Sequence, residues 1–287
     1  MSRGRATAIG FGAVLLWALL ALLTVWSAPV PPLQLNAVCF AIGGALGLTW
    51  VATSGGLGQL RVVPWRVYAF GTFGLFGYHA LYFSALRMAP AAEAGLIAYL
   101  WPLLIVLFSG LLPGERLARG HVLGAMIGFA GATLIVARGA TFEGAALPGY
   151  GLALLCALFW SGYSMLSRRL GDVPTASVAV FCSATAVLSA LAHLAFETTV
   201  WPGDATGWAA MVLLGLGPVG LAFYVWDVGV KKGDIQFLGV ASYAAPVLST
   251  LALVIADIAP VTWALVVSAG LITGGAALAA RASARVP

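Results

Sequence analysis

Polar side chains are rare inside the long apolar segments of this sequence, and three of them stand together. His79 follows Tyr78 directly, and Tyr78 and Tyr82 are spaced to share one face of a helix. A polar side chain that faces lipid is costly, so these residues are expected to face the protein interior or a water-filled cavity. The spacing therefore predicts a binding site around His79. A histidine that only hydrogen-bonds a neighbouring helix would give the same pattern.

Two prolines interrupt apolar segments at related positions. An interior proline removes one helical hydrogen bond and frees the carbonyl group four residues before it. Pro102 would free the carbonyl of Ala98, and Pro246 would free that of Ser242. Matching breaks in two halves of a chain are a pointer to a transporter site, although permanent kinks would look alike. Pro218 predicts a third bend.

Aromatic rings dominate the remaining candidates for a cavity wall. Rings offer contact area, stacking and a surface for a bound ammonium group. Phe223, next to Tyr224, stands at the position of the second half that matches His79. Asn36 is a candidate polar partner for a ligand. The alternative for these rings is an aromatic belt at the membrane surface. The aromatic candidates are Trp17, Trp101, Trp160, Tyr99, Tyr163, Tyr224 and Tyr243.

One carboxylate lies within an apolar segment. Asp227 precedes Lys231 by four residues, which makes a local ion pair on one helix geometrically available. The competing hypothesis is that Asp227 couples proton movement to a transported ligand or contacts a substrate amine. His79 is a second candidate for proton coupling, because a histidine can change charge between about pH 5 and 8.

The segments that carry these residues are predicted to cross a membrane. The chain has 287 residues, of which 62% are apolar and 8% charged, whereas a soluble domain carries roughly 25% charged residues. Ten apolar runs, each of about 20 residues, are long enough to cross a bilayer. They are residues 6–25, 33–53, 66–86, 92–112, 119–137, 149–167, 175–196, 207–229, 235–256 and 260–280. The predicted fold is an all-α integral membrane protein with ten transmembrane helices.

The basic residues indicate the orientation of these helices. Twelve of the 14 Lys and Arg fall on one side of the predicted topology, and only Arg87 and Arg138 fall on the other, where Glu143 is also expected. Cytoplasmic loops accumulate Lys and Arg. Both termini are therefore predicted to be cytoplasmic, in a bacterial inner membrane, and the net charge of +5 reflects topology and not nucleic-acid binding.

The chain also resembles itself at an offset close to half its length. The offset brings Leu16-Trp17-Ala18 over Phe159-Trp160-Ser161, and Gly95, Tyr99, Pro102 and Leu104 over Gly239, Tyr243, Pro246 and Leu248. The predicted halves are residues 1–140 and 141–287. Each holds five spans, and an odd number places the second half upside down, which is the inverted repeat of many transporters. Gly124-x-x-x-Gly128 and Gly270-x-x-x-Gly274 fit close helix packing.

These features resemble the drug/metabolite transporter superfamily with its duplicated EamA-type domain. The resemblance covers essentially the whole chain and is carried by the segment from Pro102 through Gly114-Glu115-Arg116-Leu117, followed by Gly124, Gly128 and Gly131. The second half departs from the pattern, because Asp257-Ile258-Ala259 stands where a Gly-Glu pair is expected. The aromatic-rich core is similar to exporters of aromatic amino acids of the YddG type. The resemblance implies export of such molecules.

The absence of charged residues in the predicted core limits the classes of substrate that the protein can bind. A carrier of phosphorylated compounds would need Lys or Arg in its cavity, and a pump for cationic drugs would need a carboxylate in residues 6–25, which contain none. A neutral amino acid fits, bound without a cofactor or metal and moved by alternating access. Another small amphipathic metabolite or drug is the alternative substrate. An intramembrane enzyme or a passive channel is the alternative class, and the oligomeric state is open, with a monomer compatible.

Overall fold

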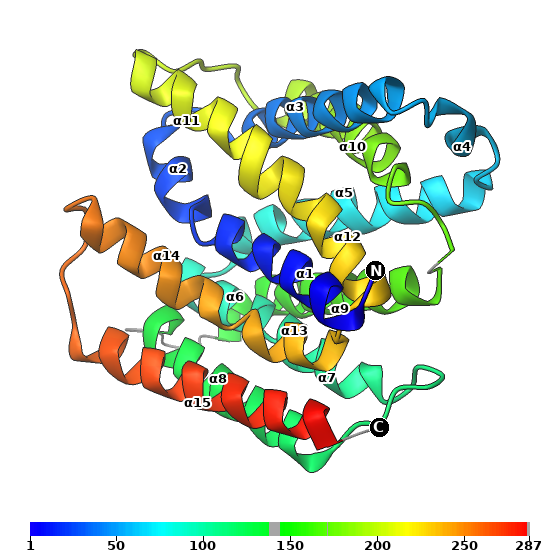
Figure 1. Ribbon diagram of the computed structural model, residues 1–287. Helices are drawn as coiled ribbons and strands as arrows, with labels where there is room; N and C mark the ends of the chain where they lie inside the picture. Colours follow the sequence, from blue (N-terminus) through cyan, green and yellow to red (C-terminus); the bar gives the residue numbers. More distant parts are fainter. Residues whose placement is uncertain (138–143, 171, 286–287) are drawn as a thin grey trace.

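The computed structural model describes residues 1–137, 144–170 and 172–285, and every regular element in these ranges is a helix (Figure 1). The first part of the chain forms α1 (Arg3–Trp17), α2 (Leu20–Trp26), α3 (Pro32–Thr53), α4 (Leu57–Arg61), α5 (Trp65–Met88), α6 (Ala91–Ala98), α7 (Trp101–Ser109) and α8 (Arg119–Val136). After the short helix η1 (Gly144–Ala146) follow α9 (Leu147–Arg169), α10 (Ser177–Phe196), α11 (Ala205–Leu216), the π-helical turn η2 (Gly217–Leu221), α12 (Ala222–Lys232), α13 (Ile235–Ala241), α14 (Ala244–Ile255) and α15 (Trp263–Arg285).

The ten predicted apolar runs each coincide with one helix or with consecutive helices. Within the described residues, eight of these segments are long and apolar enough to cross a membrane. The other two are α5 and the pair α6–α7. Helix α5 has the length but carries the polar residues Tyr78, His79 and Tyr82, and the apolar stretch of α6–α7, Glu93–Ser109, is shorter than the other segments. Arg138, Glu143 and the predicted boundary at residue 140 lie outside the described residues.

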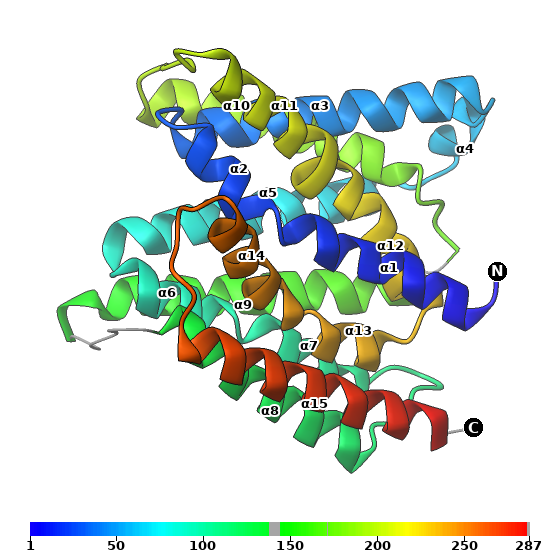
Figure 2. The same ribbon diagram turned by 60° about the vertical axis from the view of Figure 1, so that its left-hand side comes forward.

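Helices from the two halves of the chain pack against each other throughout the bundle (Figures 1 and 2). The pairs in contact are α1 with α12, α3 with α10, α5 with α9, α7 with α13, and α8 with α15. In the internal repeat, α1 corresponds to α9, and α5 corresponds to the α11–α12 segment. The contact of α1 with α12 is therefore equivalent to the contact of α9 with α5. Helices α3 and α10 correspond to each other in the repeat, as do α8 and α15, so each of these pairs joins two equivalent helices. The contact of α7 with α13 joins the two interrupted segments, α6–α7 and α13–α14, to each other.

The helices break at equivalent positions in the two halves. Helix α6 ends at Ala98 and α7 begins at Trp101, while α13 ends at Ala241 and α14 begins at Ala244. The end of α6 is separated from the end of α13 by the same number of residues as the start of α7 from the start of α14. Pro102 and Pro246 follow the breaks closely, and the predicted bend at Pro218 is the π-helical turn η2. A break between α1 and α2, after Trp17, was not expected from the sequence, because no proline is present there.

Two of the three left-handed backbone positions among the described residues are separated by the same number of residues as these helix ends. Gly114 has φ +78°, and Asp257, at the matching position of the second half, has φ +56°. Glycine adopts this conformation without steric cost, and aspartate tolerates it better than most residues. The backbone thus turns alike in both halves, and Asp257 takes the position of Gly114, which leaves Ile258 at the position of Glu115.

Gly124 of α8 and Gly275 of α15 face each other where the two helices cross. A Cβ atom at Gly124 would lie 2.6 Å from the Gly275 carbonyl oxygen, and one at Gly275 would lie 2.6 Å from that of Gly124. The prediction that Gly270 and Gly274 serve close helix packing is wrong, because a Cβ atom at either position would have no neighbour within 4 Å. The next residue along α15, Gly275, is the one that faces α8.

We expect Gly124→Ala to lower the stability of the bundle, because the added methyl group meets backbone of α15 that cannot rotate away. Overpacking of this kind costs about 1–3 kcal/mol. Gly274→Ala is the matched control on the partner helix, where space is open and alanine is favoured over glycine in helices. Thermal unfolding of both variants in detergent, followed by tryptophan fluorescence, measures the difference. Equal melting temperatures for Gly124→Ala and the parent would contradict the packing described here.

Candidate functional site

A cavity of about 150 Å³ lies where the helix breaks meet in the middle of the bundle. Its wall combines residues from both halves of the chain, and rings form most of it. The lining residues are Trp17, Leu20, Tyr78, His79, Tyr82, Ala98, Tyr99, Trp101, Trp160, Pro218, Val219, Phe223 and Ala245. The structure thus brings the predicted cluster on α5 together with Trp17, Tyr99, Trp101, Trp160 and Pro218.

His79 is held by its own helix and by rings from two others. Its Nδ1 atom lies 2.7 Å from the Leu75 carbonyl oxygen, so Nδ1 must carry a proton for the hydrogen bond to form. The imidazole packs edge-on against Phe40 on α3, with centroids 5.1 Å apart, and lies 6.2 Å from the Phe223 ring on α12. In the neutral ring, Nε2 remains as a hydrogen-bond acceptor.

Three tyrosines bring hydroxyl groups to the same cavity. Tyr78 and Tyr82 stack along α5, with centroids 6.2 Å apart and planes inclined by 3°. Tyr99 comes from the break between α6 and α7. Among the described residues, the hydroxyls of Tyr82 and Tyr99 have no hydrogen-bond partner, which leaves both able to donate to or accept from a ligand.

Four tryptophans close one side of the cavity. Trp17, Trp101, Trp160 and Trp226 form a cluster in which every pair of ring centroids is 5.2 to 6.3 Å apart. Trp226 is fully buried and donates from its indole nitrogen to the Ser164 hydroxyl, at 3.2 Å. It is not a lining residue, so it backs the three that are. The spacing of three residues from Phe223 on α12 could have revealed Trp226 from the sequence.

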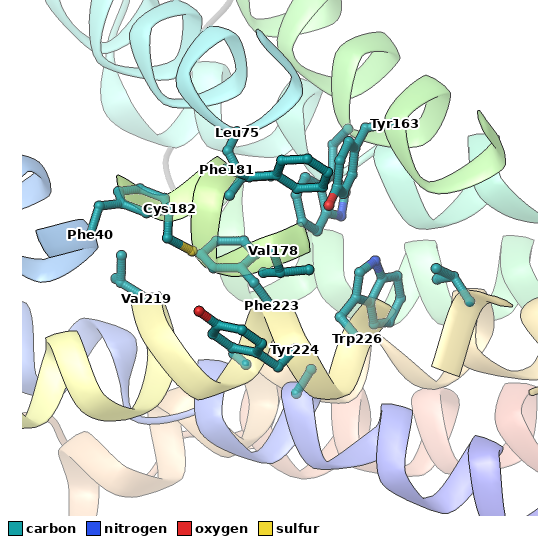
Figure 3. Packing of buried hydrophobic residues seen from close by; sticks show 14 of the residues in the cluster. Phe40, Leu75, Tyr163, Val178, Phe181, Cys182, Val219, Phe223, Tyr224 and Trp226 are labelled. Atoms are coloured by element: carbon teal, nitrogen blue, oxygen red, sulfur yellow. The ribbon is translucent and has the colours of Figure 1, made fainter. Parts of the chain in front are cut away.

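Five residues expected at the site lie outside the cavity wall, and packing explains each. Tyr163 stacks behind Trp160, with centroids 5.3 Å apart, in the buried layer that Figure 3 displays. The Tyr224 hydroxyl donates to the Gly43 carbonyl oxygen, at 2.9 Å. The Asn36 amide donates to the Ser189 hydroxyl, at 2.7 Å, and so joins α3 to α10.

The other two residues outside the wall belong to the second helix break. The Tyr243 hydroxyl accepts the backbone N–H of Leu103, at 3.0 Å. The Ser242 hydroxyl donates to the Leu238 carbonyl oxygen, and the Ser242 carbonyl oxygen accepts from the Ala245 N–H at 3.1 Å. The predicted free carbonyl at Ser242 is therefore wrong, because the turn between α13 and α14 uses it.

The prolines differ in what they contribute. Pro218 lines the cavity, and its carbonyl oxygen accepts from the Trp17 indole nitrogen at 3.2 Å. Pro102 and Pro246 are buried near the starts of α7 and α14 and do not line the cavity. Sequence reasoning also missed the apolar lining residues Leu20, Val219 and Ala245, which carry no chemical signal.

Asp227 forms the ion pair that its spacing predicted. Its Oδ1 atom lies 2.8 Å from Lys231 Nζ, and the side chain of Thr175 donates to its Oδ2 atom at 2.7 Å. Lys231 also donates to the Val173 carbonyl oxygen, at 2.9 Å. The pair is almost fully buried and lies outside the cavity wall, so it fastens α12 to the segment before α10.

No charged side chain is among the residues that line the cavity. The three cysteines are buried, and Cys182 packs within the apolar cluster around Phe223 (Figure 3). Within the described ranges, no three His, Cys, Asp or Glu side chains are grouped so that they could hold a metal ion. The cavity can therefore offer ring faces, hydroxyls and one imidazole to a ligand.

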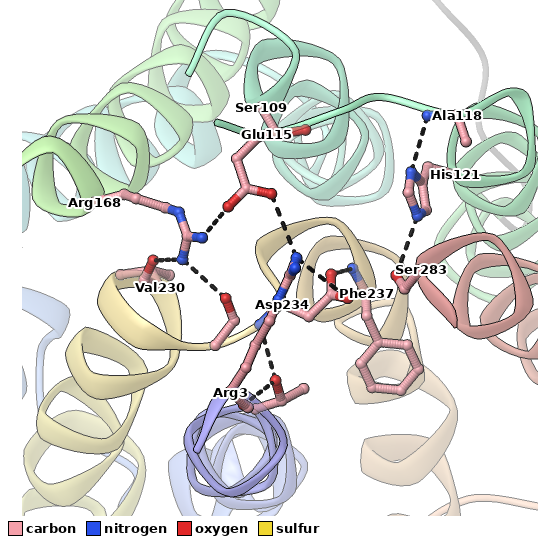
Figure 4. Close-up of polar contacts among 12 residues, drawn as sticks. Arg3, Ser109, Glu115, Ala118, His121, Arg168, Val230, Asp234, Phe237 and Ser283 are labelled. Carbon is pink, nitrogen blue, oxygen red and sulfur yellow. Dashed lines mark hydrogen bonds and ion pairs between the residues drawn. The ribbon is translucent and has the colours of Figure 1, made fainter. Parts of the chain in front are cut away.

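Several charged residues are instead connected in one network near the start of α1 (Figure 4), while Arg87 pairs with Glu197 at the ends of α5 and α10. Glu115 is in ionic contact with Arg168 and lies 3.4 Å from Arg3, which is itself 3.6 Å from Asp234. Arg168 donates further to the carbonyl oxygens of Val230 and Gly233. This ion network ties α1, the segment after α7, α9 and the turn between α12 and α13 together.

The sequence is similar to known transport proteins. The EamA-like transporter family matches residues 5–137 and 147–281. An aromatic amino acid exporter YddG of Ancylobacter novellus is 56% identical over 97% of this chain and 98% of its own length. The Escherichia coli exporter of that name is 25% identical over 97% of each chain.

A solved crystal structure has the same fold. It is 55% identical in sequence, covers 99% of this chain and all of its own, and gives a TM-score of 0.94. The predicted resemblance to EamA-type carriers is confirmed, and it places the cavity in a transport protein and not in an intramembrane enzyme. The chain belongs to the EamA-like transporter family.

Proposed function

We propose that this chain exports aromatic and other small neutral amino acids across the bacterial inner membrane. The observation that carries the proposal is the uncharged, ring-lined cavity in a chain whose relatives are named exporters of aromatic amino acids. An apolar cavity of about 150 Å³ takes up a molecule the size of benzene. An aromatic side chain would fill that space, and the polar end of the amino acid would face the hydroxyls.

The proposed binding mode assigns each polar group of a zwitterion to a different part of the wall. The ammonium group would meet Nε2 of His79 and the faces of the neighbouring rings, which attract cations. The carboxylate would accept from the hydroxyls of Tyr82 and Tyr99. No Lys or Arg is needed in this arrangement, because hydroxyl donors suffice for a substrate whose net charge is zero.

The proposed architecture is ten membrane-crossing helices in two inverted halves, residues 1–140 and 141–287, with both termini in the cytoplasm. The helix breaks at matching positions of the halves and the pairings that survive their exchange support it. With such symmetry, a rearrangement that opens one end of the bundle can close the other around a fixed site. A single chain encloses the whole cavity, which is compatible with a monomer.

In the proposed cycle, the conformation described here is closed toward the cytoplasm. The tryptophan cluster lies between the cavity and the ion network, since Arg168 follows Trp160 by eight residues on α9, about 12 Å along the helix axis. Both barriers must part to admit a substrate from the cytoplasm. Because Asp227 is already paired with Lys231, facilitated or weakly coupled transport is proposed, with His79 as the group through which protons could couple.

Efflux from vesicles that contain the purified chain tests the function. Labelled phenylalanine should leave with saturable kinetics, and unlabelled aromatic amino acids should compete more strongly than threonine. Saturable efflux of a different amphipathic metabolite, without competition by amino acids, would favour the alternative substrate class. Unsaturable flux would indicate a passive channel and overturn the proposal.

Substitutions in the cavity should reduce this efflux without loss of folded protein. We expect His79→Ala and Tyr99→Ala to lower the rate about tenfold, which corresponds to about 1.4 kcal/mol of lost interaction. Tyr82→Phe and Tyr99→Phe, which remove only a hydroxyl, should raise the half-saturating concentration. Tyr68→Phe is the matched control, since its hydroxyl donates to the Leu60 carbonyl oxygen outside the cavity. Normal transport by both alanine variants would show that the site is elsewhere.

Neutralising Glu115 should loosen the cytoplasmic side. Glu115→Gln removes the charge that holds Arg168 and Arg3. The reporter is a cysteine in place of Ser164, beside Trp226, in a chain whose native cysteines are replaced. We expect this cysteine to react about tenfold faster with a maleimide when Glu115 is neutralised. Asp172→Asn is the control, because Asp172 is an exposed acid on the loop that follows α9. Unchanged labelling in Glu115→Gln would mean that the ion network does not hold this end closed.

A further inference from the structure

A second hollow lies at the end of the bundle that carries both termini. It is an open groove of about 540 Å³ between α1, α13 and α15, and both views of the ribbon have α1 and α15 on either side of α13 (Figures 1 and 2). Its lining residues are Arg3, Gly4, Thr7, Ala8, Phe11, Asp234, Phe237, Ala280, Ser283 and Ala284. None of them lines the central cavity.

The groove is apolar along most of its length because small residues leave room beside two rings. Gly4, Ala8, Ala280 and Ala284 are small, and a Cβ atom at Gly4 would have no neighbour within 4 Å. Phe11 and Phe237 supply the large apolar surfaces. A groove of this kind on the outside of a membrane helix bundle fits a hydrocarbon chain and would otherwise be poorly filled.

The polar end of the groove is basic. The Arg3 side chain is 52% exposed, and its contacts with Glu115 and Asp234 are long, at 3.4 and 3.6 Å, so it retains donors for another acid. Asp234 is engaged by its own helix, where it accepts the Phe237 N–H at 2.9 Å. The two helices that border the groove also carry exposed arginines, at positions 5, 281 and 285. The excess of positive charge favours an anionic occupant.

We propose that this groove binds an anionic phospholipid of the leaflet that faces the two termini. The phosphate would pair with Arg3, whose planar guanidinium matches phosphate oxygens, and an acyl chain would lie against Phe11 and Phe237. A lipid satisfies both ends of the groove at once, whereas a soluble anion would use only the basic end. Basic pockets between membrane helices on the cytoplasmic side are suited to such head groups.

Native mass spectrometry of the purified chain tests this site. In detergent micelles doped with equal amounts of phosphatidylglycerol and phosphatidylcholine, the chain should retain phosphatidylglycerol at least fivefold more. Arg3→Gln should abolish the preference by removing the charge. Gly4→Leu should reduce retention of either lipid by filling the groove, without altering any charge. Arg66→Gln, which removes an exposed arginine outside the groove, should change neither result.

Three outcomes would overturn the proposal. Equal retention of the two lipids would show that charge does not select the occupant. Unchanged retention in Gly4→Leu would place the bound lipid elsewhere on the bundle. Displacement of phosphatidylglycerol by millimolar inorganic phosphate would show that only a free anion is recognised. None of these results depends on transport, so the lipid site and the exporter function can fail independently.

Discussion

Backbone hydrogen bonding in a water-poor interior is the constraint on which this structure depends. Away from water, an unpaired N–H or carbonyl group is costly, so a broken helix survives only where another group replaces the lost partner. Tyr243 provides that replacement for Leu103, and Trp17 donates to the carbonyl oxygen of Pro218. The cavity forms where these breaks meet, because an interrupted helix leaves room that a continuous one would fill.

The same constraint separates the two kinds of polar residue in the bundle. Tyr243, Ser242, Asn36 and Tyr224 give their hydrogen bonds to protein partners and hold the helices in place. The hydroxyls of Tyr82 and Tyr99 do not bond to other described residues, so both can still donate or accept a hydrogen bond. Charge is kept apart from both groups, in the ion network and in the buried Asp227–Lys231 pair, and the cavity stays neutral.

The features of the fold and of the site that could be predicted are those that depend on residues close together in the sequence. Apolar length and proline indicated the helices and most of their breaks, and the spacing within one turn of α5 grouped the residues around His79. Tyr99 and Tyr243 occupy matching sequence positions, yet one lines the cavity and the other bonds to Leu103. Likewise, Gly275 and not Gly274 meets Gly124, since one residue turns a helix by about 100°. These differences arise from packing between the halves, which no local pattern encodes.

The two halves share backbone geometry but differ in the chemistry at their ends. Gly114 and Asp257 adopt the same left-handed turn, yet the next residue is Glu115 in one half and Ile258 in the other. Glu115 enters the ion network, whereas Ile258 is an exposed apolar side chain. In the proposed inverted arrangement, these residues stand at opposite ends of the bundle. Ile258 therefore forms no ion pair, and α5 is instead joined to the end of α10 by Arg87 and Glu197, 3.1 Å apart. In the proposed arrangement both ends of the bundle thus carry an ion pair, but at positions of the two halves that do not correspond.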